Sequence, residues 1–136
     1  MSLYLDTVFD NLFDAAVEAH VHQDKWRVID CACLHVERLM IFDYDAVLAR
    51  ILALIEQFPD LDYGGPGPFG TLIEQQPVKA YEAALLASLV RQPSTQVLGW
   101  LDRTLGLDEA EREAQQLISR ARYADVLRQV IAHPRA

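Results

Sequence analysis

Cysteine and histidine side chains in the first third of the chain have types and spacings that could hold a metal ion. Cys31 and His35 stand four residues apart, so a helix places both on one face, and His20 and His22 precede them. A metal site needs three or four converging ligands, and the two-residue spacing of Cys31 from Cys33, and of His20 from His22, points the members of each pair apart. We therefore interpret the thiols as buried packing groups and predict no metal site.

Serine hydroxyls are the candidates for nucleophilic catalysis. Ser88, Ser94 and Ser119 are the relevant residues, but none lies in a Gly-x-Ser-x-Gly turn, which is the sequence context that exposes such a nucleophile. His133, the nearest potential base in sequence, is close to the last residue of the chain. The sequence therefore does not support a catalytic triad.

Two pairs of carboxylates, Asp43 with Asp45 and Asp60 with Asp62, could act as general acids and bases. Both pairs lie in polar segments typical of turns, where acids are solvated or cap helices. No group of residues in the chain meets the geometric requirements of an active site. We therefore predict that the protein is not an enzyme and carries no cofactor.

The stretch DYGGPGPFGTLIE, residues 62–74, concentrates four of the six glycines and raises the question of a phosphate-binding loop. Such a loop needs several backbone N–H groups and usually a following lysine. Pro66 and Pro68 have no N–H group, and the first lysine after them is Lys79. We instead predict a structural turn in which Gly67 is the N-cap and Pro68 the first residue of a short helix. Its predicted buried face consists of Phe69, Leu72 and Ile73.

Helical periodicity dominates the rest of the chain, because apolar residues recur at spacings of three and four. The expected helices cover residues 5–17, 26–40, 45–58, 68–73, 77–91 and 97–105. A capping box that starts at Asp108 opens a last helical region, which reaches about residue 132 and forms one helix or two. The predicted buried face of the second helix consists of Trp26, Ile29, Cys33, Val36 and Met40.

The predicted fold class is all-α, because no segment alternates between apolar and polar residues in the manner of a β-strand. Short connections favour antiparallel neighbours, either as helical hairpins stacked in a HEAT-like array or as an irregular bundle, with about six to eight helices. At 136 residues the chain fits a single domain. We divide it into an acidic sub-bundle at about residues 1–63, a Gly/Pro turn at 64–68 and a neutral sub-bundle at about 69–136.

The net charge of −8 is distributed unevenly. Residues 1–68 contain four Lys/Arg and twelve Asp/Glu, whereas residues 69–136 contain eight of each, so all the excess negative charge lies in the first half. Such a field repels nucleic-acid phosphates and favours basic partners. We therefore predict no nucleic-acid ligand.

The chain contains no apolar run of about 18 residues, the length needed to cross a bilayer. Its first residues, MSLYLDTVFDNLFD, lack the basic start and uninterrupted apolar core of a signal peptide. These features predict a cytoplasmic protein with no membrane partner.

Several short stretches in the middle of the chain carry a family resemblance. They are GPFGTLIE, Tyr81, Leu85, Ser88 with Leu89, RQPST at 91–95 and VLGWLDRTL at 97–105. This pattern resembles small helical immunity proteins of bacterial polymorphic and contact-dependent growth inhibition toxin systems. The match covers about residues 64–105; Asp102 stands where that pattern often has Asn, and the N-terminal third shows no match. The resemblance implies a cytoplasmic protein that neutralises a cognate toxin by binding it, without indicating which residues bind.

Acidic residues are the candidates for that contact. Asp6, Asp10, Asp14 and Glu18 form a ladder at four-residue spacing, and each like-charge pair destabilises an isolated helix by about 0.2–0.5 kcal/mol. The ladder is either an ordinary solvated face or a recognition surface for a basic toxin. We extend the recognition hypothesis to the turns FDYD and DLDYG, where carboxylates stand beside tyrosines. The predicted partner-binding residues are Asp10, Asp14, Asp43, Tyr44, Asp45, Asp60, Asp62 and Tyr63.

Two functions therefore remain open. In the first, the protein is an immunity protein whose acidic half binds a cognate, basic toxin. In the second, it is a helical adaptor or structural protein whose apolar groove binds a partner helix, while the acids serve only solubility. The two differ in their expected response to salt, because only the first depends on attraction between exposed charges.

Overall fold

The structure is a computed structural model that describes residues 2–104, 106, 109–114, 117, 122, 124, 125 and 128. Its α-helices are α1 Ser2–His22, α2 Trp26–Leu39, α3 Tyr44–Gln57, α4 Gly67–Ile73, α5 Glu82–Arg91, α6 Thr95–Thr104 and α7 Glu109–Ala114, and a short 3₁₀ helix, η1, covers Val78–Ala80. The all-α prediction is confirmed: the described residues form seven α-helices and no strand. The predicted cap at Asp108 and most of the region from 115 to 132 lie outside the described residues.

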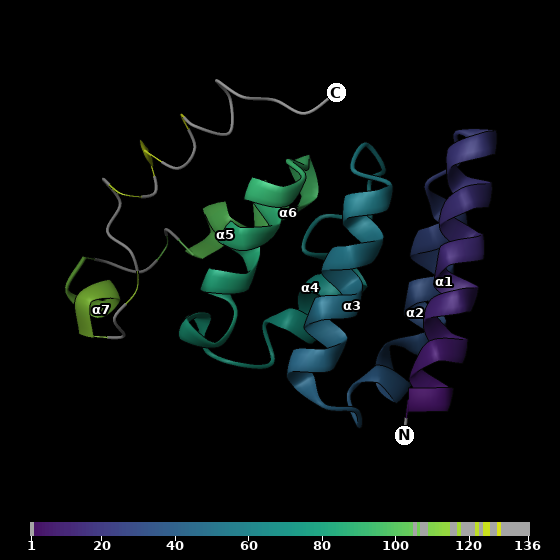
Figure 1. Ribbon diagram of the computed structural model, residues 1–136, viewed down its shortest axis with the longest axis horizontal. Helices are drawn as coiled ribbons and strands as arrows, with labels where there is room; N and C mark the ends of the chain where they lie inside the picture. Colours follow the sequence, from purple (N-terminus) through teal and green to yellow (C-terminus); the bar gives the residue numbers. More distant parts are fainter. Residues whose placement is uncertain are drawn as a thin grey trace.

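The helices lie in two rows (Figure 1). In the view shown, α1, α3 and α5 form the nearer row, and α2, α4 and α6 lie behind them. Within the rows, α1 contacts α3, α3 contacts α5, and α2 contacts α4. Contacts of α1 with α2 and of α5 with α6 join the two rows. This is the arrangement expected of stacked antiparallel hairpins, in which consecutive helices pack against each other as α1 and α2 do.

The hydrophobic core runs through both rows and both halves of the sequence. Leu12 of α1, Ile51 of α3, Leu85 of α5 and Leu101 of α6 are fully buried in one continuous cluster of apolar side chains. The predicted boundary at residues 64–68 therefore does not separate two cores. The predicted buried face of α4 is confirmed, since Phe69, Leu72 and Ile73 are all buried.

The predicted buried face of α2 is wrong in most of its positions. The buried residues are Val28, Ile29, Ala32 and Leu39. Trp26 is 57% exposed, Met40 is 44% exposed, and the Cys33 thiol is also exposed. Apolar residues occupy more than one side of α2, so periodicity alone is compatible with two buried faces. The contacts with α1 and α4 determine which face is buried.

The cysteines differ from each other in their surroundings. Cys31 is half-buried, its Sγ lies 3.8 Å from the Asn11 backbone oxygen, and burial raises the pKa of its thiol. Cys33 is exposed, so the expectation that both thiols are buried is wrong for Cys33.

The predicted helix at 77–91 is interrupted. Pro77 has an extended backbone, η1 covers the next three residues, and Tyr81 has φ −131° and ψ −13°, outside the helical region. The ladder of helical hydrogen bonds therefore restarts at Glu82, where α5 begins. The Tyr81 side chain is buried at this break.

The contact between α3 and α5 includes a carboxylate with a shifted pKa. Glu56 accepts hydrogen bonds from the Ser88 hydroxyl at 2.8 Å and from the Arg91 guanidinium at 2.9 and 3.0 Å. Burial alone would raise the pKa of Glu56, but these hydrogen bonds and the charge of Arg91 outweigh it and hold the pKa below the ordinary value of 4.5. The pair therefore stabilises the fold above pH 4.5 and ceases to do so as the pH falls through the lower, folded-state pKa.

We expect the Glu56→Gln variant to be less stable than the wild type by about 1 kcal/mol at neutral pH, because it loses a charged acceptor that is largely buried. The difference should vanish once the pH falls below the lowered pKa of Glu56, because the wild-type carboxyl is then itself protonated in the folded state. Urea unfolding at a series of pH values measures this difference. A difference that stays constant from neutral to acidic pH would show that the ionised carboxylate contributes nothing.

Candidate functional site

The structure separates the predicted partner-binding residues into three places. Asp10 and Asp14 lie on α1, Asp43 to Asp45 at the start of α3, and Asp60 to Tyr63 in the segment after α3. The second and third groups are at opposite ends of the 14-residue helix α3, which at 1.5 Å per residue is about 21 Å long. Because of this length, α3 does not bring the second and third groups together into one compact surface for a partner.

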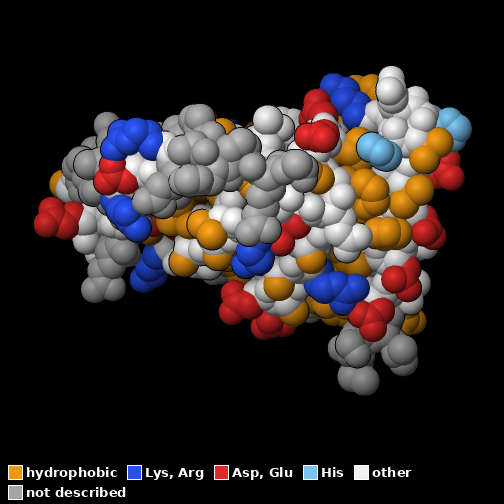
Figure 2. Space-filling view, turned by 45° about the horizontal axis from the view of Figure 1, so that its top comes forward, with side chains coloured by type: hydrophobic (Ala, Val, Ile, Leu, Met, Phe, Trp, Pro, Cys, Tyr) orange, Lys and Arg blue, Asp and Glu red, His pale blue; other side chains and the backbone are white. Residues whose placement is uncertain are grey.

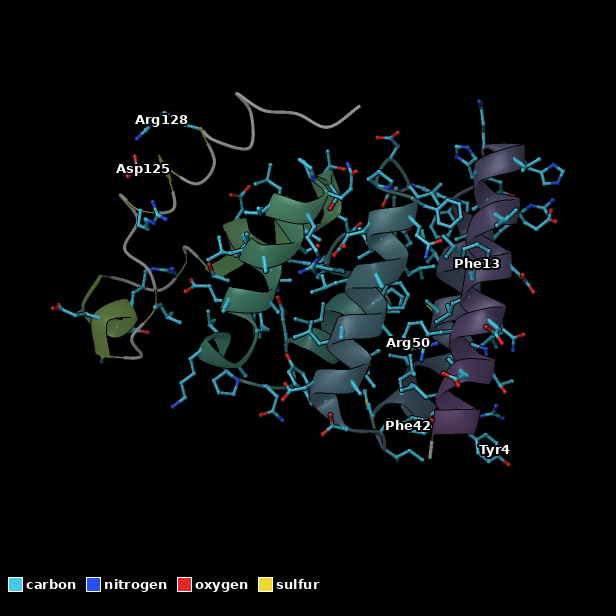
Figure 3. All side chains as sticks on the ribbon, in the orientation of Figure 1. Tyr4, Phe13, Phe42, Arg50, Asp125 and Arg128 are labelled. Carbon is cyan, nitrogen blue, oxygen red and sulfur yellow. The ribbon has the colours of Figure 1, made fainter. Side chains whose placement is uncertain are left out.

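On α1, the ends of the acidic ladder are neutralised. Asp6 is paired with Arg50 of α3 at 2.7 Å, and Glu18 lies 3.0 Å from the His22 ring and 4.0 Å from Arg27. Figure 3 shows Arg50 on the side of α3 that faces α1. The two middle acids, Asp10 and Asp14, are exposed and form no ion pair within the described part of the chain. Figure 2 shows acidic side chains spaced along the edge formed by α1, with hydrophobic side chains beside them.

In the turn before α3, only one of the three predicted residues is an unengaged carboxylate. Asp43 is the N-cap of α3, and its Oδ2 accepts a hydrogen bond from the Ala46 backbone N–H at 3.0 Å. The Tyr44 hydroxyl donates to the Ile73 backbone oxygen at 2.6 Å. Burial, the neighbouring Tyr81 and the charge of Asp45 all raise the pKa of Tyr44. Asp45 itself is exposed.

In the segment after α3, Asp62 and Tyr63 are structural. The Gly64 N–H donates to Asp62 at 2.8 Å and Lys25 is paired with it at 3.2 Å; both contacts lower the pKa of the Asp62 carboxyl. Tyr63 is 1% exposed, and its hydroxyl donates to the Phe58 backbone oxygen at 3.1 Å. The prediction that the Tyr63 side chain contacts a partner is therefore wrong, because it fills the core instead. Asp60 is exposed.

Asp60, Leu61 and Asp62 form a ridge between two hollows in the surface. One hollow, of about 410 Å³, is bounded on its far side by Trp100 and Arg103 of α6. The other, of about 580 Å³, is bounded by His20 and the exposed ring of Trp26 at the turn between α1 and α2. Lys25 lies 5.4 Å from the centre of the Trp26 ring while it pairs with Asp62, so a cation of the chain itself already occupies part of this second hollow.

The Gly/Pro loop, residues 64–68, is held by α6. The Gln96 side chain accepts from the Tyr63 backbone N–H at 3.0 Å and donates to the Gly65 backbone oxygen at 2.9 Å. Trp100 donates from Nε1 to the Pro66 backbone oxygen at 3.1 Å. Gln96 and Trp100 of α6 therefore fix the position of the loop.

Two glycines of this region are required by geometry. Gly67 has φ +68°, in the left-handed region that favours glycine, and it is the first residue of α4, while Pro66 is the N-cap. The predicted cap was therefore one residue too late. A Cβ on Gly70 would lie 3.1 Å from Trp100 Nε1 and 3.1 Å from Pro66 Cβ, so a larger residue would require the Trp100 and Pro66 side chains to shift by a few tenths of an ångström.

Two acids that the sequence analysis did not select lie on α2. Asp30 and Glu37 are exposed and form no ion pair among the residues described. They are seven residues apart, which places them on the same side of a helix, and that spacing is the signal that could have identified them. In the first half of the chain, the exposed acids that neither pair with a cation nor cap a helix are Asp10, Asp14, Asp30, Glu37, Asp45 and Asp60.

Across the described residues, no three side chains of His, Cys, Asp or Glu come together in a way that could hold a metal ion. No helix of this part of the chain has both the length and the apolar character to span a membrane. Comparison of the chain with protein-family models, with curated proteins and with solved structures finds no match in any of the three.

Proposed function

We propose that this protein binds a basic protein partner through carboxylates of its first half, and that it thereby neutralises the partner without performing chemistry. The observation that carries the proposal is a set of six exposed carboxylates that neither pair with a cation nor cap a helix in the described structure. They are Asp10, Asp14, Asp30, Glu37, Asp45 and Asp60. The neutralising role comes from the resemblance of residues 64–105 to immunity proteins of bacterial toxin systems.

The placement of these acids supports recognition through long-range attraction. They lie on α1, on α2 and near both ends of α3, so the negative field comes from several elements of the first half and does not depend on one pair. Such a field raises the rate at which a basic protein associates and suppresses association of acidic ones. Each exposed pair adds little affinity by itself, so the effect belongs to the group.

A second candidate function, an adaptor that binds a partner helix, is favoured by a different observation. Two large apolar side chains are exposed at the turn between α2 and α3: Met40 is 44% exposed and Ile41 is 82% exposed. Contacts of this kind change little with salt, because apolar burial is not screened. The salt dependence of association therefore distinguishes the two functions.

The experiment measures the association kinetics of this chain with a basic toxin domain, taken from the neighbouring gene if that gene encodes one. We expect the double variants Asp10→Lys/Asp14→Lys and Asp45→Lys/Asp60→Lys each to slow association by about ten-fold at low salt, on the scale of electrostatically steered pairs. Their free energies of unfolding should change by less than about 0.5 kcal/mol, because these carboxylates are exposed and unpaired. Asp43 and Asp62 are not used, because they cap a helix and close a turn.

Glu113→Lys is the matched control, since it reverses an exposed acid in α7, within the neutral half. It should leave the association rate within about two-fold of the wild type at the same salt concentration. Wild-type kinetics in both double variants would contradict the acidic-recognition proposal. Association that is equally fast at low and high salt for the wild type would favour the adaptor function instead.

A further inference from the structure

An apolar pocket opens between the end of α2, the start of α3 and the end of α4. Its volume is about 190 Å³. The walls are formed by Leu39, Met40, Phe42, Tyr44, Val47, Leu48, Ile51, Leu72 and Ile73, and the amides Gln75 and Gln76 complete the rim. None of the residues that the structure brings together here is charged, so the interior suits an uncharged, apolar group.

The pocket is held open by fixed contacts. Asp43 caps α3 directly beside it, and the Tyr44 hydroxyl is bonded to the Ile73 backbone oxygen at 2.6 Å, which ties the start of α3 to the end of α4. The polar atom of Tyr44 is thereby satisfied, and the ring contributes only its apolar surface. A pocket whose walls are fixed in advance costs little to organise when it is filled.

Exposed apolar side chains lie at the pocket and in the turn beside it. Met40 is 44% exposed and Ile41 is 82% exposed, in the turn that leads into α3. Figure 3 shows Phe42 in this turn, at the same end of the molecule as Tyr4, which is 72% exposed at the start of α1. This end of the molecule therefore offers apolar surface around a preformed cavity, the combination found at the centres of protein interfaces.

Negative charge beside the pocket favours a basic occupant. Asp45 is exposed next to the pocket residue Tyr44, close enough that its charge raises the pKa of the Tyr44 hydroxyl. A second copy of this chain carries a net charge of −8 and would bring further acids to the same place. A basic partner would instead gain from the attraction while its apolar side chain leaves water.

We propose that this pocket receives one apolar side chain of the basic partner, with a neighbouring Lys or Arg of that partner beside Asp45. The inference rests on the proposed function and adds the anchor point of the complex. A cavity of about 150 Å³ lined by apolar side chains is large enough for benzene, so a pocket of 190 Å³ accommodates the side chain of Phe, Leu or Met. The surrounding exposed apolar groups would then exclude water from the anchor.

The test uses two synthetic peptides of twelve residues, each built from Lys, Gly and Ser, that differ only in a central Phe or Ser. Affinity is measured by isothermal titration calorimetry at low salt, and the location by NMR of protein labelled at its Met, Ile and Leu methyl groups. We expect the Phe peptide to bind about ten-fold more tightly than the Ser peptide, on the scale of burying one aromatic side chain. Only the Phe peptide should shift the methyl signals of Met40, Ile51, Leu72 and Ile73.

Three variants make the test specific to the pocket. Gln75→Trp places a bulky side chain at the rim from an exposed position, and it should abolish the advantage of the Phe peptide over the Ser peptide. Asp45→Lys should weaken the binding of both peptides at low salt. Asp60→Lys is its matched control, because Asp60 is an exposed acid at the other end of α3 and does not line this pocket, and it should weaken binding less than Asp45→Lys does.

The outcomes separate this inference from the function on which it rests. Equal binding of the two peptides, with a salt dependence but no shift of the pocket methyls, overturns the pocket as an anchor and leaves acidic recognition standing. Binding of the Phe peptide that shifts the pocket methyls but ignores salt and the Asp45→Lys change overturns the basic occupant. Pocket methyl shifts that grow with protein concentration in the absence of peptide overturn the proposal in favour of a second copy.

Discussion

The Arg112→Ala variant is expected to lose about 3–5 kcal/mol of folding free energy, because it removes the guanidinium from a buried ion pair. Arg112 of α7 is fully buried, and its Nη2 donates to Glu82 at the start of α5 at 2.5 Å. Its Nη1 donates to the backbone oxygen of the buried residue Thr104 at 2.8 Å. One side chain therefore joins α7 to both α5 and α6.

A double variant separates two contributions to the free energy of unfolding: the effect of removing one charge, and the contribution of the ion pair itself. Glu82→Leu combined with Arg112→Met replaces both charges with apolar groups, and such replacements of buried pairs are often neutral. We expect the double variant to lie within about 2 kcal/mol of the wild type, whereas each single change costs more. Urea unfolding followed by circular dichroism measures all four proteins. A loss below about 1 kcal/mol in Arg112→Ala would mean that water replaces the guanidinium and that the site is not closed.

The helices themselves were predictable because their signals are local. Pro59 follows the end of α3, the apolar spacing of Leu5, Val8 and Leu12 marks the buried side of α1, and Phe69 with Leu72 marks that of α4. Each of these signals depends on residues within about one or two turns of each other. Local spacing therefore located the described helices, although α1 extends to His22 beyond the expected residue 17 and the expected helix at 77–91 is broken at Tyr81.

The face of α2 was not predictable from the same kind of signal. Val28 and Ala32 are buried while Trp26 and Met40 are exposed, although hydropathy would place the larger side chains inside. Ala32 is small enough to let α1 approach closely, and that advantage depends on α1, a different part of the chain. The neighbouring helices determine which of the two apolar faces is buried, and the periodicity of α2 carries no information about those neighbours.

The candidate site was predictable only in part, because exposure depends on contacts that are distant in sequence. Asp45 and Asp60 are exposed as predicted, but Tyr63 is buried against Phe69, with ring centres 5.8 Å apart. The Gly/Pro loop was recognised as a turn, whereas its attachment to Gln96 spans 33 residues from Tyr63. The apolar pocket likewise joins three helices, and no single stretch of sequence describes it.

The second large effect concerns Trp100, one of two tryptophans in the chain. Trp100 is 2% exposed, packs beside Gly70 and donates its indole hydrogen bond to Pro66. Trp100→Ala should cost about 3–5 kcal/mol, because it opens a cavity and removes this bond. Trp100→Phe keeps most of the ring and should cost about 1–2 kcal/mol, chiefly through the Pro66 carbonyl left without its donor. Both values are measured by urea unfolding.

Trp26 supplies the matched control, because it is 57% exposed at the turn between α1 and α2. Trp26→Phe should change the free energy of unfolding by less than about 0.5 kcal/mol. The remaining tryptophan in each variant also provides a separate fluorescence signal, so unfolding near α6 and near α2 can be followed independently. Equal losses in Trp26→Phe and Trp100→Phe would contradict the assignment of Trp100 as the residue that holds the Gly/Pro loop.

The Trp100→Phe variant also tests whether the stretches that resemble immunity proteins act as a scaffold or as a contact surface. Trp100 is buried and its indole N–H is already engaged, so a folded Trp100→Phe protein retains every exposed carboxylate of the first half. We therefore expect it to associate with the basic partner at the wild-type rate, although it unfolds at a lower urea concentration. If the folded variant instead associates more than about ten-fold more slowly, the hollow between Asp60 and Trp100 belongs to the interface, and recognition is not confined to the acids.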